Sequence, residues 1–176
     1  MTEKAKYPIG RFKPSEAIDA EMIQRWITEI EAFPEQLKTA VTGWTDEQLD
    51  TPYRDGGWTI RQLIHHVADS HMNSYIRFKW ALTEDSPIIK AYDEKSWAEL
   101  PEAKAAPVAI SLDLLTALHK RWVLVLKNLS ESDLKRYFVH PESGEQIPLA
   151  NNVALYAWHS RHHLHHVLQL KESKGW

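Results

Sequence analysis

Four long stretches of the sequence place apolar residues on one face of a helix. Each residue of an α-helix turns the chain by about 100°, so apolar side chains that recur every three or four positions form one stripe. Such a stripe must be buried against another element. The stretches cover residues 17–42, 59–83, 111–129 and 150–171. Together they predict an all-α fold, a four-helix bundle.

Local signals mark where helices begin. Thr45 with Gln48, and Thr59 with Gln62, match the capping-box pattern, in which the two residues satisfy each other's free backbone N–H groups. The first pattern predicts a short turn of helix and the second predicts the start of the second long helix. Pro34 lies inside the first helix and predicts either a kink or the start of a new segment.

The connections between these helices differ in length. Residues 1–15 predict an extended arm, and residues 138–140 and 146–148 predict a small β-hairpin. Residues 86–110 form a connection that is long for a compact domain, with one short helix near 94–99. We expect this connection to be a crossover or a segment that covers a functional site.

Composition excludes several classes of protein. The 176 residues are expected to form a single domain, 1–176, with 21 basic and 24 acidic side chains and no basic run, so nucleic acid binding is not expected. The lack of cysteine excludes disulfides and protein thiol nucleophiles. No apolar run is long enough for a membrane span, and no signal-type segment opens the chain. We therefore expect a cytoplasmic location and no membrane partner.

Half of the ten histidines lie in one eight-residue segment of the last predicted helix, residues 159–166. They are His159, His162, His163, His165 and His166. The pair His159 and His163 lies near the centre of the inward face, one turn apart, so two imidazoles can point at one position in space. His162 and His166 share this spacing but lie to one side, and His165 is expected to be solvated.

Several inward histidines on one stripe are hard to satisfy by hydrogen bonds alone, and in protonated form they repel one another. A shared cation removes both difficulties. Imidazole suits zinc, nickel, copper and iron. We therefore expect one divalent metal ion per chain.

The second long helix offers a third ligand. His66 borders the apolar side of this helix and continues as a polar line with Ser70, Asn73 and Arg77. This line indicates either a solvated face or the wall of a pocket. If it is a wall, Asp69, Asn73 and Arg77 are the candidates that orient a substrate.

The remaining histidines carry weaker signals. His119 lies in the middle of the apolar stripe of the third long helix, which is typical of a buried, hydrogen-bonded residue or a pocket wall and less so of a distant ligand. His65 points away from the polar line. His71 and His140 show no pattern above background.

Three stretches carry a resemblance to a known family. Residues 52–62, 65–73 and 156–163, with the motifs Gly-Gly-Trp-Thr-Ile-Arg-Gln and Trp-His-Ser-Arg-His-His, resemble the DinB/YfiT-like family and, more narrowly, its YfiT type of metal-dependent hydrolases. The likeness extends over essentially the whole chain. It implies a four-helix bundle with metal ligands at His66, His159 and His163, bound zinc or nickel, and a cytoplasmic homodimer.

Three neutral nitrogens leave open coordination positions, which is the arrangement of catalytic metal sites. The first hypothesis is a hydrolase that acts on a small-molecule substrate with a metal-activated water. The second is a thiol-dependent, bacillithiol-type S-transferase, in which the metal activates the thiol of a low-molecular-weight cosubstrate. The third is a non-catalytic metal-binding module.

Overall fold

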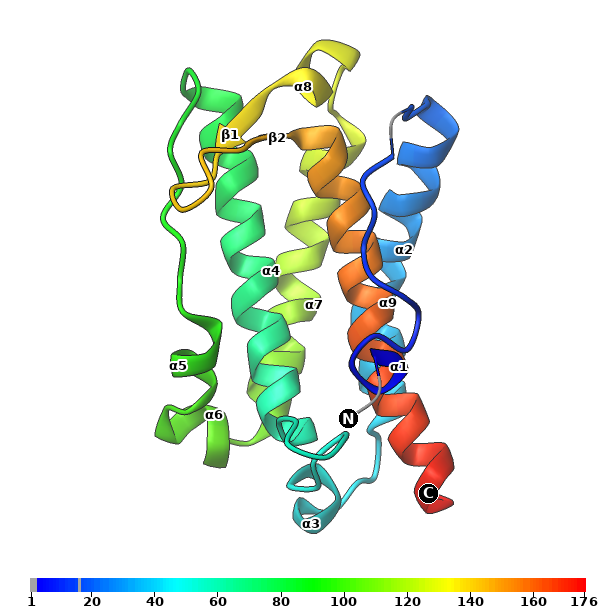
Figure 1. Ribbon diagram of the computed structural model, residues 1–176. Helices are drawn as coiled ribbons and strands as arrows, with labels where there is room; N and C mark the ends of the chain where they lie inside the picture. The colour runs from blue at the N-terminus through cyan, green and yellow to red at the C-terminus, as the bar shows by residue number, and fades with distance from the viewer. Residues whose placement is uncertain (1–2, 16) are drawn as a thin grey trace.

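The computed structural model describes residues 3–15 and 17–176, and four long helices dominate it (Figure 1). These are α2 (Ala20–Ala40), α4 (Ile60–Thr83), α7 (Val108–Lys127) and α9 (Leu149–Lys174). The shorter elements are α1 (Glu3–Lys6), α3 (Asp46–Leu49), α5 (Glu94–Ala98), α6 (Pro101–Ala105), α8 (Glu131–Lys135), β1 (Tyr137–Val139) and β2 (Gln146–Pro148). Among the helices of the described residues, none is long and apolar enough to cross a bilayer.

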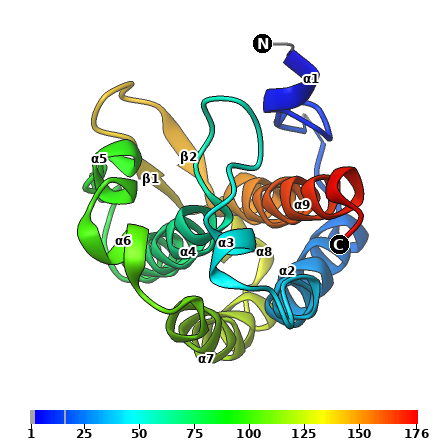
Figure 2. The same cartoon turned by 90° about the horizontal axis from the view of Figure 1, so that it is seen from below.

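The long helices form a closed ring in the order α2, α9, α4, α7 (Figure 2). Each packs against the two beside it, which confirms the predicted four-helix bundle. Figure 1 shows that α4 and α7 run in one direction, and α2 and α9 in the other. The bundle therefore contains two parallel and two antiparallel neighbouring pairs.

The parallel pair α4 and α7 explains the long connection predicted from the sequence. Because both helices run the same way, the chain must return along the length of the bundle before α7 can begin. It does so over residues 84–107, outside α4, against which α5 and α6 pack (Figure 1). Near its start this crossover pairs with the hairpin, where Ile89 N donates to Val139 O at 3.1 Å.

The predicted helix starts are observed. The side chain of Thr59 accepts a hydrogen bond from Gln62 N, and the side chain of Gln62 accepts one from Thr59 N, which fixes the first turn of α4. Thr45 and Gln48 form the same box at α3. The hairpin is also confirmed, as the antiparallel pair β1 and β2.

Some local predictions were wrong. The segment expected to be an extended arm contains the helical turn α1, and residues 1–2 of that prediction lie outside the described residues. Helices α6 and α8 were not predicted, although Pro101 starts the first and a capping box at Ser130 and Asp133 starts the second. Pro34 begins no new segment, because α2 continues through it.

The core consists of two apolar clusters with polar side chains between them. One cluster includes Ile30, Phe78 and Trp122, and the other includes Phe33 and Val67. On α4, α7 and α9 the stretch between the two clusters carries buried or half-buried histidine and serine side chains. The functional site is built in and beside this polar layer.

Candidate metal centre

Three histidines from two helices converge at one position. His159 and His163 lie one turn apart on α9, and their Nε2 atoms are 3.2 Å apart. The ring of His66, on α4, has its centroid 5.6 Å from that of His159 and 5.1 Å from that of His163. One ring nitrogen from each of the three lies within 4.8 Å of the others. The structure therefore brings together the three residues singled out from the sequence.

The donor set fits a divalent metal ion. Zinc binds imidazole nitrogen at about 2.0–2.1 Å, so two such nitrogens on one tetrahedral ion are about 3.3 Å apart. The 3.2 Å between the Nε2 atoms of His159 and His163 is close to this separation. Three nitrogen ligands without a carboxylate or thiolate suit a divalent transition metal and leave at least one coordination position open.

Burial keeps these imidazoles neutral. It lowers the pKa of His66 to about 4, and the nearby His162 adds to this shift. Burial, with the neighbouring histidines, lowers the pKa of His159 and that of His163 well below the ordinary value. Because only a neutral imidazole has a free lone pair for a metal, all three rings are ready to bind one at neutral pH.

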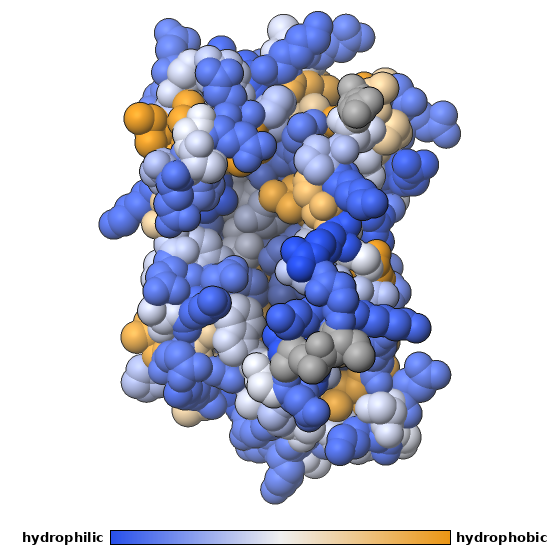
Figure 3. All heavy atoms as spheres, viewed as in Figure 1, coloured by the Kyte–Doolittle hydropathy of each residue, from blue (hydrophilic) through white to orange (hydrophobic). Residues whose placement is uncertain are grey.

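A cavity of about 840 Å³ opens beside the three histidines, within the size range of small-molecule sites. Figure 3 shows this face of the molecule hollowed near its middle. The wall combines aromatic rings with charged groups of both signs. Besides the three histidines it consists of Lys6, Tyr7, Tyr53, Arg54, Gly56, Gly57, Trp58, Gln62, Glu94, Lys95, Glu99, Trp158 and His162.

A tight loop before α4 brings part of this wall into place. Tyr53 N donates to Trp58 O at 3.1 Å, and Gly57 N donates to Arg54 O at 3.0 Å. A Cβ atom at Gly57 would lie 2.7 Å from Arg54 Cγ and 3.2 Å from Arg54 O, so glycine permits this close approach. The loop places the Trp58 ring 4.7 Å from the ring of His66, between centroids.

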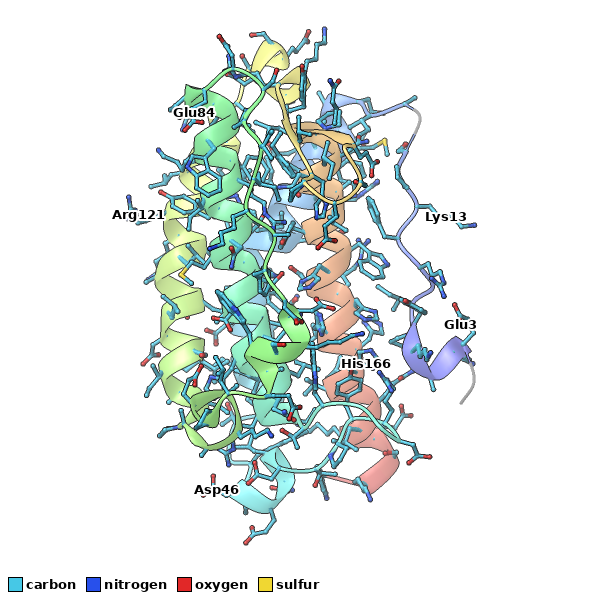
Figure 4. The ribbon with its side chains drawn as sticks, turned by 60° about the vertical axis from the view of Figure 1, so that its left-hand side comes forward. Glu3, Lys13, Asp46, Glu84, Arg121 and His166 are labelled. Atoms are coloured by element: carbon cyan, nitrogen blue, oxygen red, sulfur yellow. The ribbon has the colours of Figure 1, made fainter. Side chains whose placement is uncertain are left out.

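The N-terminal arm supplies another part of the wall. Figure 4 shows the segment between Glu3 and Lys13 alongside α9. Trp158 Nε1, on α9, donates a hydrogen bond to Gly10 O at 3.2 Å and so holds the arm against the helix. The arm contributes Tyr7 to the cavity.

Buried polar contacts fix the start of α4. Arg61 is buried, and its guanidinium donates to Asp50 at 2.6 Å and to Asp46 at 2.7 Å, which ties α4 to α3. Gln62 Nε2 donates to Ala98 O at 2.7 Å, which ties α4 to α5. These contacts set the rotation of α4 and therefore the direction in which its histidines point.

His162 and His166, the second pair with this spacing on α9, contact other aromatic residues. His162 stacks on Trp158, with centroids 4.6 Å apart, and His166 packs against Tyr53 at 4.2 Å. His165 is exposed, as predicted. Figure 4 shows His166 on α9 in the lower part of the bundle.

The three candidate pocket residues of α4 do not line the cavity. Asp69, Asn73 and Arg77 are half-buried, and Asn73 Nδ2 donates to Asp69 O within α4. Burial, with the charge of Glu102, raises the pKa of Asp69 to about 6. A role in orienting a substrate stays a prediction for these residues.

Two histidines have more specific surroundings than the sequence suggested. His71, which showed no pattern, is fully buried and lies within hydrogen-bonding distance of both His119 and His159. His119 is buried and hydrogen-bonded, which is one of the two roles favoured from the sequence. His65 contacts Ser111 and points away from the cluster, as predicted. A signal for His71 was present, because it follows Val67 by one turn on the buried stripe of α4.

Comparison with known proteins identifies the family. The model of the DinB superfamily matches residues 29–167. The chain belongs to the DinB superfamily. Its curated relatives in this superfamily include YfiT of Bacillus subtilis, 54% identical over 97% of this chain and 96% of the relative, and a protein of Oceanobacillus iheyensis, 54% identical over 97% and 98%. Both are named "Putative metal-dependent hydrolase".

Solved structures of related proteins support the same fold. The structure of Bacillus subtilis YfiT, described as an unusual four-helix bundle, matches with a TM-score of 0.96 and 53% identity, over 98% of this chain and 99% of that one. A mycothiol-dependent maleylpyruvate isomerase matches with a TM-score of 0.50 and 20% identity, over 84% of this chain and 60% of that one. The second likeness shows a shared fold alone.

Proposed function

We propose that this DinB-superfamily protein is a metal-dependent hydrolase whose single divalent ion, zinc or nickel, is bound by His66, His159 and His163. The observation that carries the proposal is the convergence of three neutral ring nitrogens beside a cavity of small-molecule size. The names of its 54% identical relatives agree with it.

A divalent ion held by three imidazoles supplies a Lewis acid with open coordination positions. The chain supplies the surroundings. Tyr53, Trp58 and Trp158 line the cavity and offer apolar surface for the carbon framework of a substrate. Charged residues of both signs in the wall favour a polar small molecule that carries a carbonyl group.

Glu94 is the cavity carboxylate best suited to accept a proton. Two glutamates line the cavity, and Glu99 is engaged with Lys104 at 2.6 Å, which lowers its pKa. Burial instead raises the pKa of Glu94. In the proposed step a Glu94 oxygen accepts a proton from water as the water oxygen bonds to the substrate carbonyl carbon. The bond from that carbon to the leaving group then breaks, and the leaving group takes up the proton held by Glu94.

The test combines metal analysis with an activity screen. Untagged protein is expected to contain one equivalent of zinc or nickel, and His159→Ala to contain none. Ester and amide substrates are then screened with and without added low-molecular-weight thiol. Metal-dependent hydrolysis without thiol supports the proposal.

Two outcomes overturn it. Turnover of electrophiles only with added thiol assigns the site to the S-transferase hypothesis. A tightly bound metal with no turnover under either condition assigns the chain to the non-catalytic class. Homodimer formation is a separate proposal, which sedimentation of the purified protein tests.

A further inference from the structure

Two buried histidines and the half-buried His159 form a continuous hydrogen-bonded line through the bundle. His159 Nδ1 lies 3.0 Å from His71 Nε2, and His71 Nδ1 lies 2.8 Å from His119 Nε2. His119 Nδ1 lies 2.7 Å from Ile30 O. The line therefore contains one residue from each of the four long helices α9, α4, α7 and α2.

We infer that His71 and His119 are positioning residues, which fix the tautomer and orientation of His159 so that its Nε2 lone pair faces the metal position. The inference rests on the proposed metal site. It assigns a role to two residues outside the three ligands and outside the cavity wall.

The direction of every proton in this line follows from its last member. A backbone carbonyl can only accept, so His119 Nδ1 must carry hydrogen and, in a neutral ring, His119 Nε2 must accept. His71 Nδ1 must then donate to it, which leaves His71 Nε2 as an acceptor. His159 Nδ1 must donate to that atom. The only lone pair left on the His159 ring is therefore on Nε2, the atom 3.2 Å from His163 Nε2.

The surroundings hold the rings in place. His71 is fully buried and His119 is 2% exposed. Their planes lie at an angle of 21°, with Phe33 5.4 Å from His71 and Trp122 5.6 Å from His119, between centroids. A ring flip would break two hydrogen bonds of a buried side chain. Burial also lowers the pKa of His119 to about 4, so the neutral form that the line requires is the one present.

The other α9 ligand lacks such support. His163 Nδ1 is buried and, among the described residues, has no hydrogen-bond partner. Metal-binding histidines usually donate their second ring N–H to a carbonyl or carboxylate, and loss of that partner typically weakens metal binding 10- to 100-fold. In this protein His71 accepts the second ring N–H of His159. His119 in turn links His71 to the backbone carbonyl of Ile30 in α2.

The first test reads the tautomer directly in metal-free wild-type protein by ¹⁵N NMR of the histidine rings. We expect His159, His71 and His119 all to be Nδ1–H tautomers at pH 7. Observation of His159 as the Nε2–H tautomer overturns the inference. This measurement stands even if the protein proves to bind no metal, a result that would reject the proposed function separately.

The second test measures zinc affinity by competition with a chromophoric chelator. His71→Phe and His119→Leu are expected to weaken zinc binding 10- to 100-fold. His119→Gln is expected to restore most of it, because its amide can donate to Ile30 O and accept from His71. The matched control is His65→Phe, which removes a buried histidine of α4 that contacts Ser111 and lies outside the line.

Folding of each variant is checked by circular dichroism, and a variant that fails to fold leaves the tautomer measurement to decide. If His71→Phe and His65→Phe lower zinc affinity equally while wild type binds tightly, the positioning role is wrong and the three-histidine site stands. If wild type does not bind zinc or nickel, the proposed function fails.

Discussion

The Nε2 atoms of His159 and His163 lie 3.2 Å apart, one turn of α9 from each other. This separation is close to that of two nitrogens bound to one tetrahedral ion, about 3.3 Å. Without a cation the pair would bring two lone pairs together unless one ring donates to the other. The predictions below follow from this relationship and from the surroundings of the two rings.

Removal of a ligand should abolish metal binding. His163→Ala leaves two of three nitrogens, and we expect its zinc affinity to fall by at least about 100-fold, beyond the usual effect of a residue that only contacts a ligand. Isothermal titration measures the affinity. The matched control is His165→Ala, an exposed histidine on the same helix, which should bind as wild type does. Unchanged binding by His163→Ala would remove it from the ligand set.

Metal should stabilise the fold. A ligand that binds only the native state at 100 times its dissociation constant raises the free energy of unfolding by about 2.7 kcal/mol. Urea unfolding of chelator-treated protein, with and without added zinc, should show this difference. The same addition should leave the stability of His159→Ala unchanged. A gain equal to that of wild type in this variant would place the ion elsewhere.

The metal-free protein should lose stability in mild acid. The pKa of His119 is lowered by burial to about 4, below its ordinary value of 6.5. Between these two values the unfolded chain binds a proton that the folded chain does not, so stability is full above pH 6.5 and falls as the pH drops toward 4. The shift corresponds to roughly 3 kcal/mol. Urea unfolding at several pH values should show a shallower decline for His119→Gln than for wild type.

Loss of the proposed proton acceptor should slow turnover without loss of metal. Glu94→Gln is expected to lower kcat about 100-fold or more, within the range of general acid–base catalysis. Glu99→Gln, which alters the carboxylate engaged with Lys104, should retain near wild-type kcat. Steady-state kinetics measures kcat of both variants, and metal analysis shows whether either has lost the ion. Equal effects of the two substitutions would argue against a specific role for Glu94.

Sequence reasoning found the elements that local patterns determine. The capping box of Thr59 and Gln62 and the apolar stripes located the long helices, and the i, i+4 spacing of His159 and His163 located the centre of the site. Its position beside the apolar side of α4 made His66 a candidate, and the family resemblance singled it out as the third ligand. These signals depend on residues close together in the sequence.

The missed features depend on contacts between distant segments. The contacts of His71 with His119 and His159 gave no signal, because these partners lie 48 and 88 residues away in the sequence. Tyr53 and Trp58 were not expected in the cavity wall, since their placement depends on how the loop around Gly57 folds back. The order in which helices surround a core also requires the tertiary structure.

The shared direction of α4 and α7 has a consequence for how such proteins can diversify. The chain must travel the length of the bundle between these helices, and the segment that does so contributes Glu94, Lys95 and Glu99 to the cavity. None of the three histidines of the cluster lies on it. Substitutions, insertions or deletions in residues 84–107 can therefore alter substrate selectivity over evolution while the histidine geometry, set by α4 and α9, is preserved.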